Sequence, residues 1–124
     1  MSLADYFETT KGIGVLGTAN AQGNVDTALY GRPHFIDDDT VAFIMNDRLS
    51  YQNVQSNPNA AYMFIEQAEG YAGKRLHLAK TKESDDPELI ASLRRTEHGA
   101  KDTEPKTKHL VYFKITRIRP LVGG

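Results

Sequence analysis

The 124-residue chain contains no cysteine. This absence excludes disulfides, thiolate nucleophiles and zinc or iron–sulfur sites with cysteine ligands. Long apolar runs are also missing, and none approaches the roughly eighteen residues that a membrane helix needs. The first residues, MSLADYFETTKG, lack the basic and apolar regions of a signal peptide. We therefore expect a cytoplasmic protein that does not enter a membrane.

The chain also lacks an excess of charge of either sign. Lysine and arginine number 15 and the acidic residues 16, which gives a net charge of −1. A nucleic-acid-binding domain is usually strongly basic, so we expect no nucleic acid among the partners. The length is that of one domain able to sustain its own core. The sequence therefore predicts a single domain over residues 1–124.

Metal and catalytic signatures are scarce as well. The four histidines are not spaced as metal ligands on one helix face are, and no arrangement of serine, histidine and aspartate is evident. The glycine-rich stretch GIGVLG occupies a predicted strand instead of opening a helix, unlike a dinucleotide-binding fingerprint. We predict no metal site and can name no catalytic residue.

Hydrophobic periodicity and turn residues predict six strands and three short helices. The strands are expected at 12–19, 25–35, 40–46, 60–67, 74–83 and 109–120, and the helices at 2–10, at 49–56 and from Asp85 or Asp86 to Gly99. Gly31 and Pro33 indicate that the second strand bends near its end. Residues 100–108 are expected to form a loop. Strands joined by tight turns favour an antiparallel barrel with small helices attached.

The stretch RLSYQNVQSNPNAAYMF places Arg48 and Ser50 where a strand gives way to a helix. Free backbone N–H groups and the positive end of the helix dipole gather at such a junction. An arginine and a hydroxyl at this point are typical of an anion site. The alternative is that Ser50 merely caps the helix and Arg48 is solvated, and the residues alone leave both open.

Two further stretches have a functional and a structural interpretation. In ALYGR, Ala28, Tyr30 and Arg32 share one strand face, which suits a flat aromatic ligand or simply a bulged barrel strand. In GYAGKR, glycines stand beside Lys74 and Arg75. This second stretch can form an anion-binding loop, or a flexible turn with solvated charges.

The order of these motifs resembles a known family. A hairpin ending in RPHF, the apolar strand TVAFIMN and then DRLSYQNVQSNPNAAYMF are together similar to the pyridoxamine-phosphate-oxidase-like, FMN-binding split-barrel family. The resemblance covers about Phe7 to Ile118. It implies a mainly β fold, a six-stranded antiparallel split β-barrel, in a homodimer that binds FMN between its subunits. It also implies a small flavin oxidoreductase or flavin reductase of unknown substrate.

The resemblance further implies which residues contact FMN. Arg48, Ser50 and the backbone of Leu49 would hold the phosphate, and residues 28–30 would line the isoalloxazine ring. Many family members have lysine where this chain has Leu49, so another cation would have to compensate. The full set of predicted cofactor contacts is Ala28, Leu29, Tyr30, Met45, Asn46, Arg48, Leu49, Ser50, Lys74 and Arg75.

Two other functions remain open from the sequence. The chain ends soon after its last strand, whereas the oxidases proper carry further substrate-binding segments, so we do not expect it to oxidise pyridoxamine phosphate. A non-catalytic module for FMN, haem or another flat anion is the main alternative, with His34, His77 or His109 as a haem ligand. A structural dimer without a cofactor is the other. FAD and F420 are not distinguished from FMN.

Overall fold

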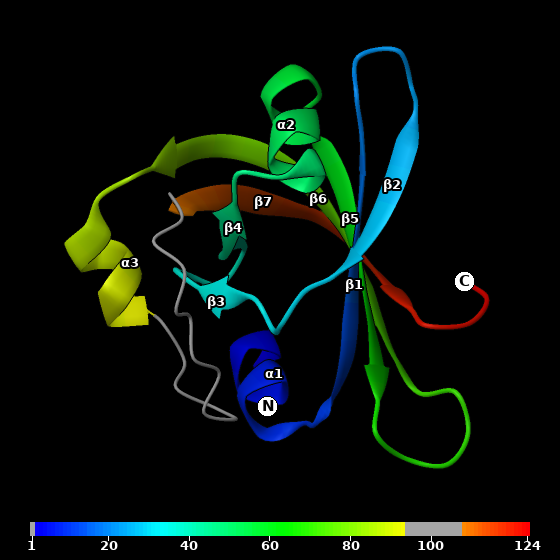
Figure 1. The fold of residues 1–124 in the computed structure, drawn as a ribbon. Helices are drawn as coiled ribbons and strands as arrows, with labels where there is room; N and C mark the ends of the chain where they lie inside the picture. The colour runs from blue at the N-terminus through cyan, green and yellow to red at the C-terminus, as the bar shows by residue number, and fades with distance from the viewer. Residues whose placement is uncertain (1, 94–107) are drawn as a thin grey trace.

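Residues 2–93 and 108–124 are described by a computed structural model, in which an antiparallel sheet carries small helices at its margins (Figure 1). The elements in chain order are α1 (Leu3–Thr9), β1 (Gly12–Ala19), β2 (Val25–Leu29), β3 (His34–Phe35), β4 (Thr40–Asn46), α2 (Leu49–Ser56), β5 (Asn59–Glu66), β6 (Gly73–Ser84), α3 (Pro87–Leu93) and β7 (Lys108–Pro120). The mainly β, antiparallel fold predicted from the sequence is confirmed.

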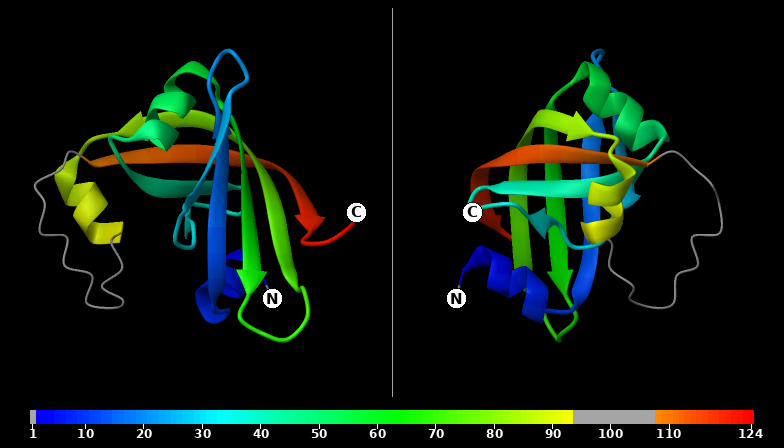
Figure 2. Two further views of the ribbon diagram at one scale, coloured as in Figure 1. Left: turned by 45° about the vertical axis from the view of Figure 1, so that its right-hand side comes forward. Right: turned by 90° about the vertical axis from the view of Figure 1, so that its left-hand side faces the viewer.

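The sheet is curled, and its strand order shows why. The order is β2-β1-β5-β6-β7-β4-β3, so β2 and β3 lie at opposite edges. Residues 30–33 alone join these two edges, and so short a segment spans at most about 18 Å. The sheet must therefore bend round until its edges approach each other, as Figures 1 and 2 show. Among the described strands no ladder closes the gap between β2 and the β3–β4 edge, and we call this gap the seam.

The expected strand 25–35 is divided in two. Strand β2 ends at Leu29 and β3 resumes at His34, because Gly31 and Pro33 interrupt the ladder as their backbone properties predict. This division gives seven strands where the sequence suggested six. Helix α3 begins at Pro87 as expected, with the Asp86 carboxylate accepting from the Glu88 N–H at 3.0 Å. The predicted end at Gly99 and the loop up to residue 107 lie outside the described residues.

The inner face of the sheet encloses the main core. Its members include Phe7 from α1, Phe43 from β4, Val54 from α2 and Tyr62 from β5. A smaller cluster packs α3 against the other face of β4 and β7. Helices α1 and α2 lie at opposite ends of the curled sheet (Figures 1 and 2). Because α2 is held by the core through Val54, its first turn is fixed beside the seam.

Within the described residues, no helix has both the length and the apolar character required to cross a membrane.

Candidate functional site

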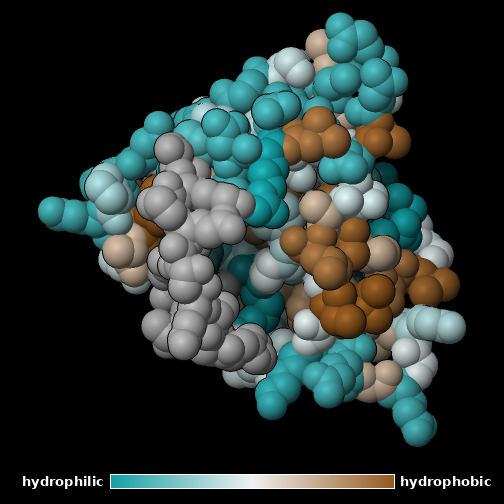
Figure 3. Space-filling model, in the orientation of Figure 1, coloured by the Kyte–Doolittle hydropathy of each residue, from teal (hydrophilic) through white to brown (hydrophobic). Residues whose placement is uncertain are grey.

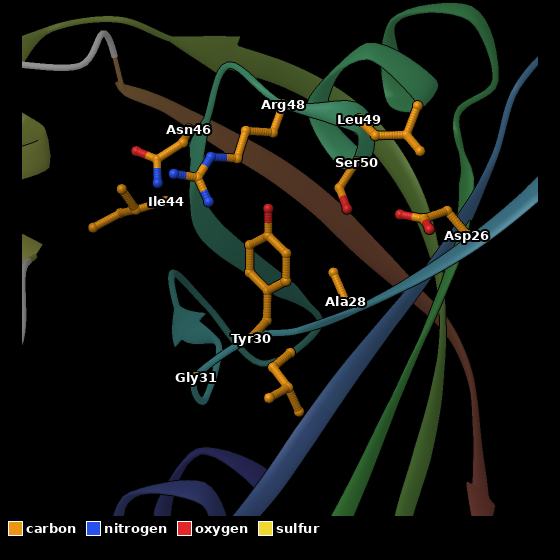
Figure 4. A pocket seen from close by; sticks show the side chains of 10 residues that line it. Asp26, Ala28, Tyr30, Gly31, Ile44, Asn46, Arg48, Leu49 and Ser50 are labelled. Carbon is orange, nitrogen blue, oxygen red and sulfur yellow. The ribbon is translucent and has the colours of Figure 1, made fainter.

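A cavity of about 430 Å³ opens at the seam between β2, the end of β4 and the start of α2 (Figure 4). We call it the seam pocket. One wall is the face of β2, and the opposite wall comes from β4 and the residues that lead into α2. The lining residues are Asp26, Ala28, Leu29, Tyr30, Gly31, Ile44, Asn46, Arg48, Leu49 and Ser50. The discontinuity in the barrel thus coincides with the residues that the sequence singled out.

Helix α2 presents an uncapped amino end to this pocket. Arg48 occupies the N-cap position with an extended backbone, and its side chain makes no capping hydrogen bond. The first helical bond runs from the Gln52 N–H to the Arg48 carbonyl at 3.0 Å, so the preceding N–H groups have no acceptor within the helix. The interpretation of Ser50 as the helix cap is wrong, because Ser50 is already the second residue of the helix. The helix end is therefore available to a ligand.

Three side chains converge on that end of the pocket. Figure 4 shows the Tyr30 ring directed towards Arg48 and Ser50. Burial raises the pKa of Tyr30, while a hydrogen bond with the Ser50 hydroxyl and the positive charge of Arg48 partly lower it. Tyr30 consequently keeps its proton at neutral pH. A guanidinium, two hydroxyls and the free amides of α2 form a site suited to an anion.

Asp26 is a lining residue that sequence reasoning missed. It projects from β2 on the same side as Ala28 and Tyr30 (Figure 4). The spacing of two residues along β2 was the available signal, since alternate side chains share one strand face. Arg48 and Asp26 are the charged residues of the pocket lining, and their formal charges cancel. The pocket of the single chain therefore offers an anion little net positive charge.

Tyr62 positions the pocket wall at the point where β2 ends. Its buried hydroxyl donates to the Gly31 carbonyl at 3.0 Å and lies 3.3 Å from the Tyr30 carbonyl. Gly14 leaves the space for this hydroxyl, because a Cβ there would overlap it. The Tyr30 N–H in turn donates to the Gly14 carbonyl at 3.0 Å. These contacts fix the backbone from which the Tyr30 side chain reaches the pocket.

A buried pair fixes the other wall. The Asn53 amide on α2 donates to the Thr18 hydroxyl on β1 at 3.0 Å, and both residues are buried. Asn57 ends the helix, and its side chain donates to the Asn20 carbonyl at 3.3 Å. The asparagines of the motif are thus structural, because they attach α2 to the β1–β2 hairpin.

Comparison with known proteins gives a result at the level of fold. No family model and no curated protein matches the chain. An FMN-binding protein from Syntrophomonas wolfei superposes with a TM-score of 0.79 at 17% identity, covering 98% of this chain and 84% of that one. A candidate pyridoxamine 5′-phosphate oxidase from Lactobacillus delbrueckii gives 0.68 at 16% identity, covering 94% and 88%. The chain has the pyridoxamine-phosphate-oxidase-like split-barrel fold.

The same split-barrel fold occurs in a haem storage protein. HutZ from Vibrio cholerae superposes with a TM-score of 0.69 at 14% identity, covering 97% of this chain and 95% of that one. At such identities the likeness concerns the arrangement of strands and helices. The ligand of this chain must therefore be inferred from its own pocket.

Seven of the ten predicted contact residues line the seam pocket of this split barrel, namely Ala28, Leu29, Tyr30, Asn46, Arg48, Leu49 and Ser50. Met45 instead lies in the core with its side chain fully buried. Lys74 Nζ lies 4.7 Å from the centre of the Tyr6 ring, and Arg75 donates to the Pro120 carbonyl at 2.8 Å. Lys74 and Arg75 thus do not line the seam pocket.

Arg32 also leaves the pocket, although alternation along a continuous strand placed it beside Tyr30. Its guanidinium donates to the Phe7 and Glu8 carbonyls at 3.0 and 3.2 Å. The break after Leu29 redirects the chain towards α1, which explains the difference. Arg32 therefore tethers α1 to the segment that crosses the seam.

A second polar cluster, missed by sequence reasoning, lies where α2 meets the ends of β6 and β7. His109 Nδ1 lies 2.6 Å from an Asp85 carboxylate oxygen, and the Tyr51 ring stacks on the His109 ring at 3.8 Å. Glu83 accepts from the Tyr51 hydroxyl at 2.6 Å and from Lys80 at 2.7 Å. Ligand atoms of Glu83, Asp85 and His109 lie within 4.8 Å of one another. Asp85 and His109 are far apart in the sequence, so a search for closely spaced metal ligands did not find this cluster.

Hydrogen bonds within this second cluster hold Glu83 in its charged form. Burial opposes ionisation of Glu83, but hydrogen bonds from Lys80, Tyr51 and Gln55 prevail and lower its pKa to about 2. Partial burial and the hydrogen bond to this carboxylate raise the pKa of the Tyr51 hydroxyl. The cluster therefore fastens α2 to β6 through hydrogen bonds that are already formed without a ligand.

Proposed function

We propose that the chain binds FMN in the seam pocket and acts as a small flavin oxidoreductase or flavin reductase. The observation that carries this proposal is the meeting, in one pocket, of an uncapped helix end, Arg48 and Ser50 with the flat wall of β2. The helix end, Arg48 and Ser50 suit an anionic ester at one end of a planar ligand. The flat wall of β2 suits an aromatic ring. FMN combines both features.

The phosphate would lie at the amino end of α2. Its nearly double negative charge suits a guanidinium, a hydroxyl and aligned backbone N–H groups. Arg48 is exposed and reaches over the pocket, whereas Ser50 is only 5% exposed and is held by Tyr30. The Arg48 guanidinium can thus adjust its position to a ligand, whereas the Ser50 hydroxyl is already oriented in the ligand-free protein.

The ring would lie along β2. Strand β2 pairs with β1 on one edge, and its other edge faces the seam. Ala28 and Leu29 offer an apolar wall there, and the unpaired backbone edge offers donors and acceptors to the polar atoms of a ring. When bound, FMN would supply the redox chemistry. The residues of this chain would bind and orient it.

The proposal includes a homodimer with the pocket at its interface. The outer face of the sheet, opposite the core, exposes large apolar side chains: Val25 is 81% exposed, Leu29 77% and Ile13 60%. Figure 3 shows apolar residues gathered on the side of the molecule where β1 and β2 lie. Such patches commonly form interfaces, and a two-fold dimer is the commonest soluble assembly. Leu29 belongs to both the patch and the pocket lining, so the two are continuous.

Ligand binding and identity test the proposal. The purified protein should be yellow, and mass spectrometry of the released ligand should identify FMN. Equilibrium dialysis should then show tighter binding of FMN than of riboflavin, because the phosphate contributes charge-assisted hydrogen bonds. FAD and F420 are the comparison ligands. A folded protein that binds riboflavin and FMN equally, or neither, would reject the proposal.

A non-catalytic haem-binding module is the second candidate, and one buried atom favours it. His109 Nε2 is buried without a hydrogen-bond partner among the described residues. An Asp85 carboxylate oxygen lies 2.6 Å from Nδ1, and a carboxylate partner of this kind orients the ring of many metal-ligating histidines. Haem titration of the parent and of a His109→Ala variant separates the two candidates. A Soret band that needs His109, without FMN binding, would favour the module; His34 and His77 are the other histidines to substitute.

A further inference from the structure

A lysine stands directly behind one wall of the seam pocket. Lys108 begins β7 and Asn46 ends β4, and the two residues are cross-strand partners in the sheet. The Lys108 ammonium donates to Asn46 Oδ1 at 2.9 Å, and both residues are half-buried. Asn46 lines the pocket, whereas Lys108 does not. One amide group therefore separates this positive charge from the cavity.

The hydrogen bond from Lys108 determines which way the Asn46 amide faces. An ammonium group has donors and no acceptor, so its partner in the amide is the oxygen. The two N–H donors on Nδ2 are then directed away from Lys108, and Figure 4 shows this nitrogen turned towards the Arg48 guanidinium. The Asn46 side chain thus offers donors to the cavity. A wall of this kind suits a ligand group that consists of acceptors.

Asn46 is also connected to the start of α2 through its backbone. Its carbonyl accepts from the Arg48 N–H at 2.8 Å, immediately before the helix begins at Leu49. The side chain of Asn46 is held by Lys108 and its backbone by Arg48. The end of β4 is therefore fixed to β7 on one side and to the uncapped helix end on the other.

A phosphate in this pocket requires more positive charge than the lining supplies. The formal charges of Arg48 and Asp26 cancel, and Leu49 contributes none. Lys108 adds a cation directly behind Asn46. Its charge acts on a ligand bound to the amide, because hydrogen bonds arranged in a chain polarise one another. The amide N–H groups become stronger donors as a result.

We propose that Lys108 is the second cation of the phosphate site and acts through Asn46. Asn46 contacts the phosphate with its N–H groups. Lys108 is a positioning residue that fixes the amide and places positive charge behind it. A phosphate monoester carries nearly two negative charges at neutral pH and offers acceptors to these donors. This inference deepens the proposed FMN function and rests on it.

Substitution of Lys108 tests the role of its charge. Lys108→Met removes the charge from a side chain of similar length, so it should weaken FMN about 10-fold and riboflavin less than about 2-fold. Lys108→Arg keeps the charge and the donors, and it should restore most of the FMN affinity. The control Lys114→Met makes the same change at an exposed position of β7 and should alter neither affinity. An unchanged ratio of FMN to riboflavin affinity in Lys108→Met would overturn the proposal.

Substitution of Asn46 separates this role from a purely structural one. In Asn46→Asp the new carboxylate still accepts from Lys108, so the contact between β4 and β7 is kept as a salt bridge. The N–H donors are lost, however, and the Lys108 charge is neutralised. The variant should unfold at a temperature equal to or above that of the parent, yet bind FMN at least about 10-fold more weakly. Parental FMN affinity in this variant would assign the pair to the fold alone.

Nuclear magnetic resonance separates failure of this inference from failure of FMN binding. The side-chain amide signals of Asn46 are assigned by their absence from Asn46→Asp. They should shift when FMN or inorganic phosphate is added, and not when sodium chloride is added to the same ionic strength. A parent that binds FMN no better than riboflavin would reject the proposed function. A parent that prefers FMN while these signals stay in place would reject only the role assigned to Asn46 and Lys108.

Discussion

The two sides of α2 carry polar clusters of opposite character. Towards β6 and β7, Tyr51, Glu83 and Lys80 satisfy one another through short hydrogen bonds. Towards the seam, Arg48 and the first amides of the helix have no such partners in the described chain. Both clusters contain charge beside hydroxyls, so composition does not distinguish them. What differs is whether the hydrogen-bond donors already have acceptors, and the donors without acceptors at the seam pocket are the reason for proposing a ligand there.

Substitution on the side of α2 that faces the seam should have the largest effect on binding and a smaller effect on stability, the latter because Ser50→Ala removes a buried hydrogen bond with Tyr30. Arg48→Ala/Ser50→Ala should weaken FMN on the order of 100-fold, because two polar contacts to a charged phosphate are lost. Riboflavin binding should change far less. Fluorescence titration measures both affinities. The control is Lys114→Ala, which removes an exposed cation of β7 that does not line the pocket. Equal losses for FMN and riboflavin would contradict the placement of the phosphate beside these residues.

Substitution in the cluster on the side of α2 towards β6 and β7 should instead lower stability and leave FMN affinity nearly unchanged. Glu83→Gln should lower the free energy of unfolding on the order of 2 kcal/mol at neutral pH, with little change in FMN affinity. The lowered pKa of Glu83, about 2 against an ordinary 4.5, makes its contribution complete above pH 4.5. That contribution is lost as the pH falls towards 2, so parent and variant should converge there.

Urea denaturation at several pH values measures this convergence. The exposed residue Glu69 provides the control Glu69→Gln, which should resemble the parent throughout. A difference between parent and Glu83→Gln that persists undiminished near pH 2 would show that ionisation of Glu83 is not its source.

A substitution on α2 between the two clusters should lower both the stability of the protein and its affinity for FMN. Asn53→Ala leaves the buried Thr18 hydroxyl without its donor, and such a loss destabilises by about 1–3 kcal/mol. FMN affinity should fall as well, because α2 is less firmly placed beside the seam. Thermal unfolding and FMN titration should be compared with the exposed control Gln52→Ala. Full FMN affinity in a destabilised Asn53→Ala variant would show that helix placement does not govern the pocket.

The smallest effect is expected at the wall opposite α2. Tyr62→Phe removes the hydroxyl that holds the Tyr30–Gly31 backbone, at about 1 kcal/mol in stability and a few-fold in FMN affinity. The exposed residue Tyr71 gives the control Tyr71→Phe. Affinity loss without any loss of stability would refine the comparison, since Tyr62 would then act on the pocket alone.

Local signals in the sequence predicted much of the fold. Asn57 and Pro58 end α2 and Pro87 opens α3, because proline and capping geometry act within a few residues. The interruption near Gly31 and Pro33 was also visible, although its consequence, a separate strand β3, was not. Strand order was not predictable in the same way, since it depends on contacts between distant segments.

The site was predictable only where it is continuous in sequence. Residues 48–50 form one stretch, and their convergence with Tyr30 follows from the family resemblance. Asp26 was missed because a polar residue alternating along a strand also fits a solvated face. The family pattern suggested Lys74 and Arg75 as further contacts to the phosphate, yet Lys74 lies against the Tyr6 ring and the strand register carries Arg75 to the outer face. The pairing of Asp85 with His109 needed the fold itself.

The seam also bears on how this scaffold tolerates change. Its lining side chains stand at a break in the sheet, so replacing them removes no hydrogen bond between paired strands. Exchange of a few of these side chains can therefore change the chemistry of the pocket while the fold is kept.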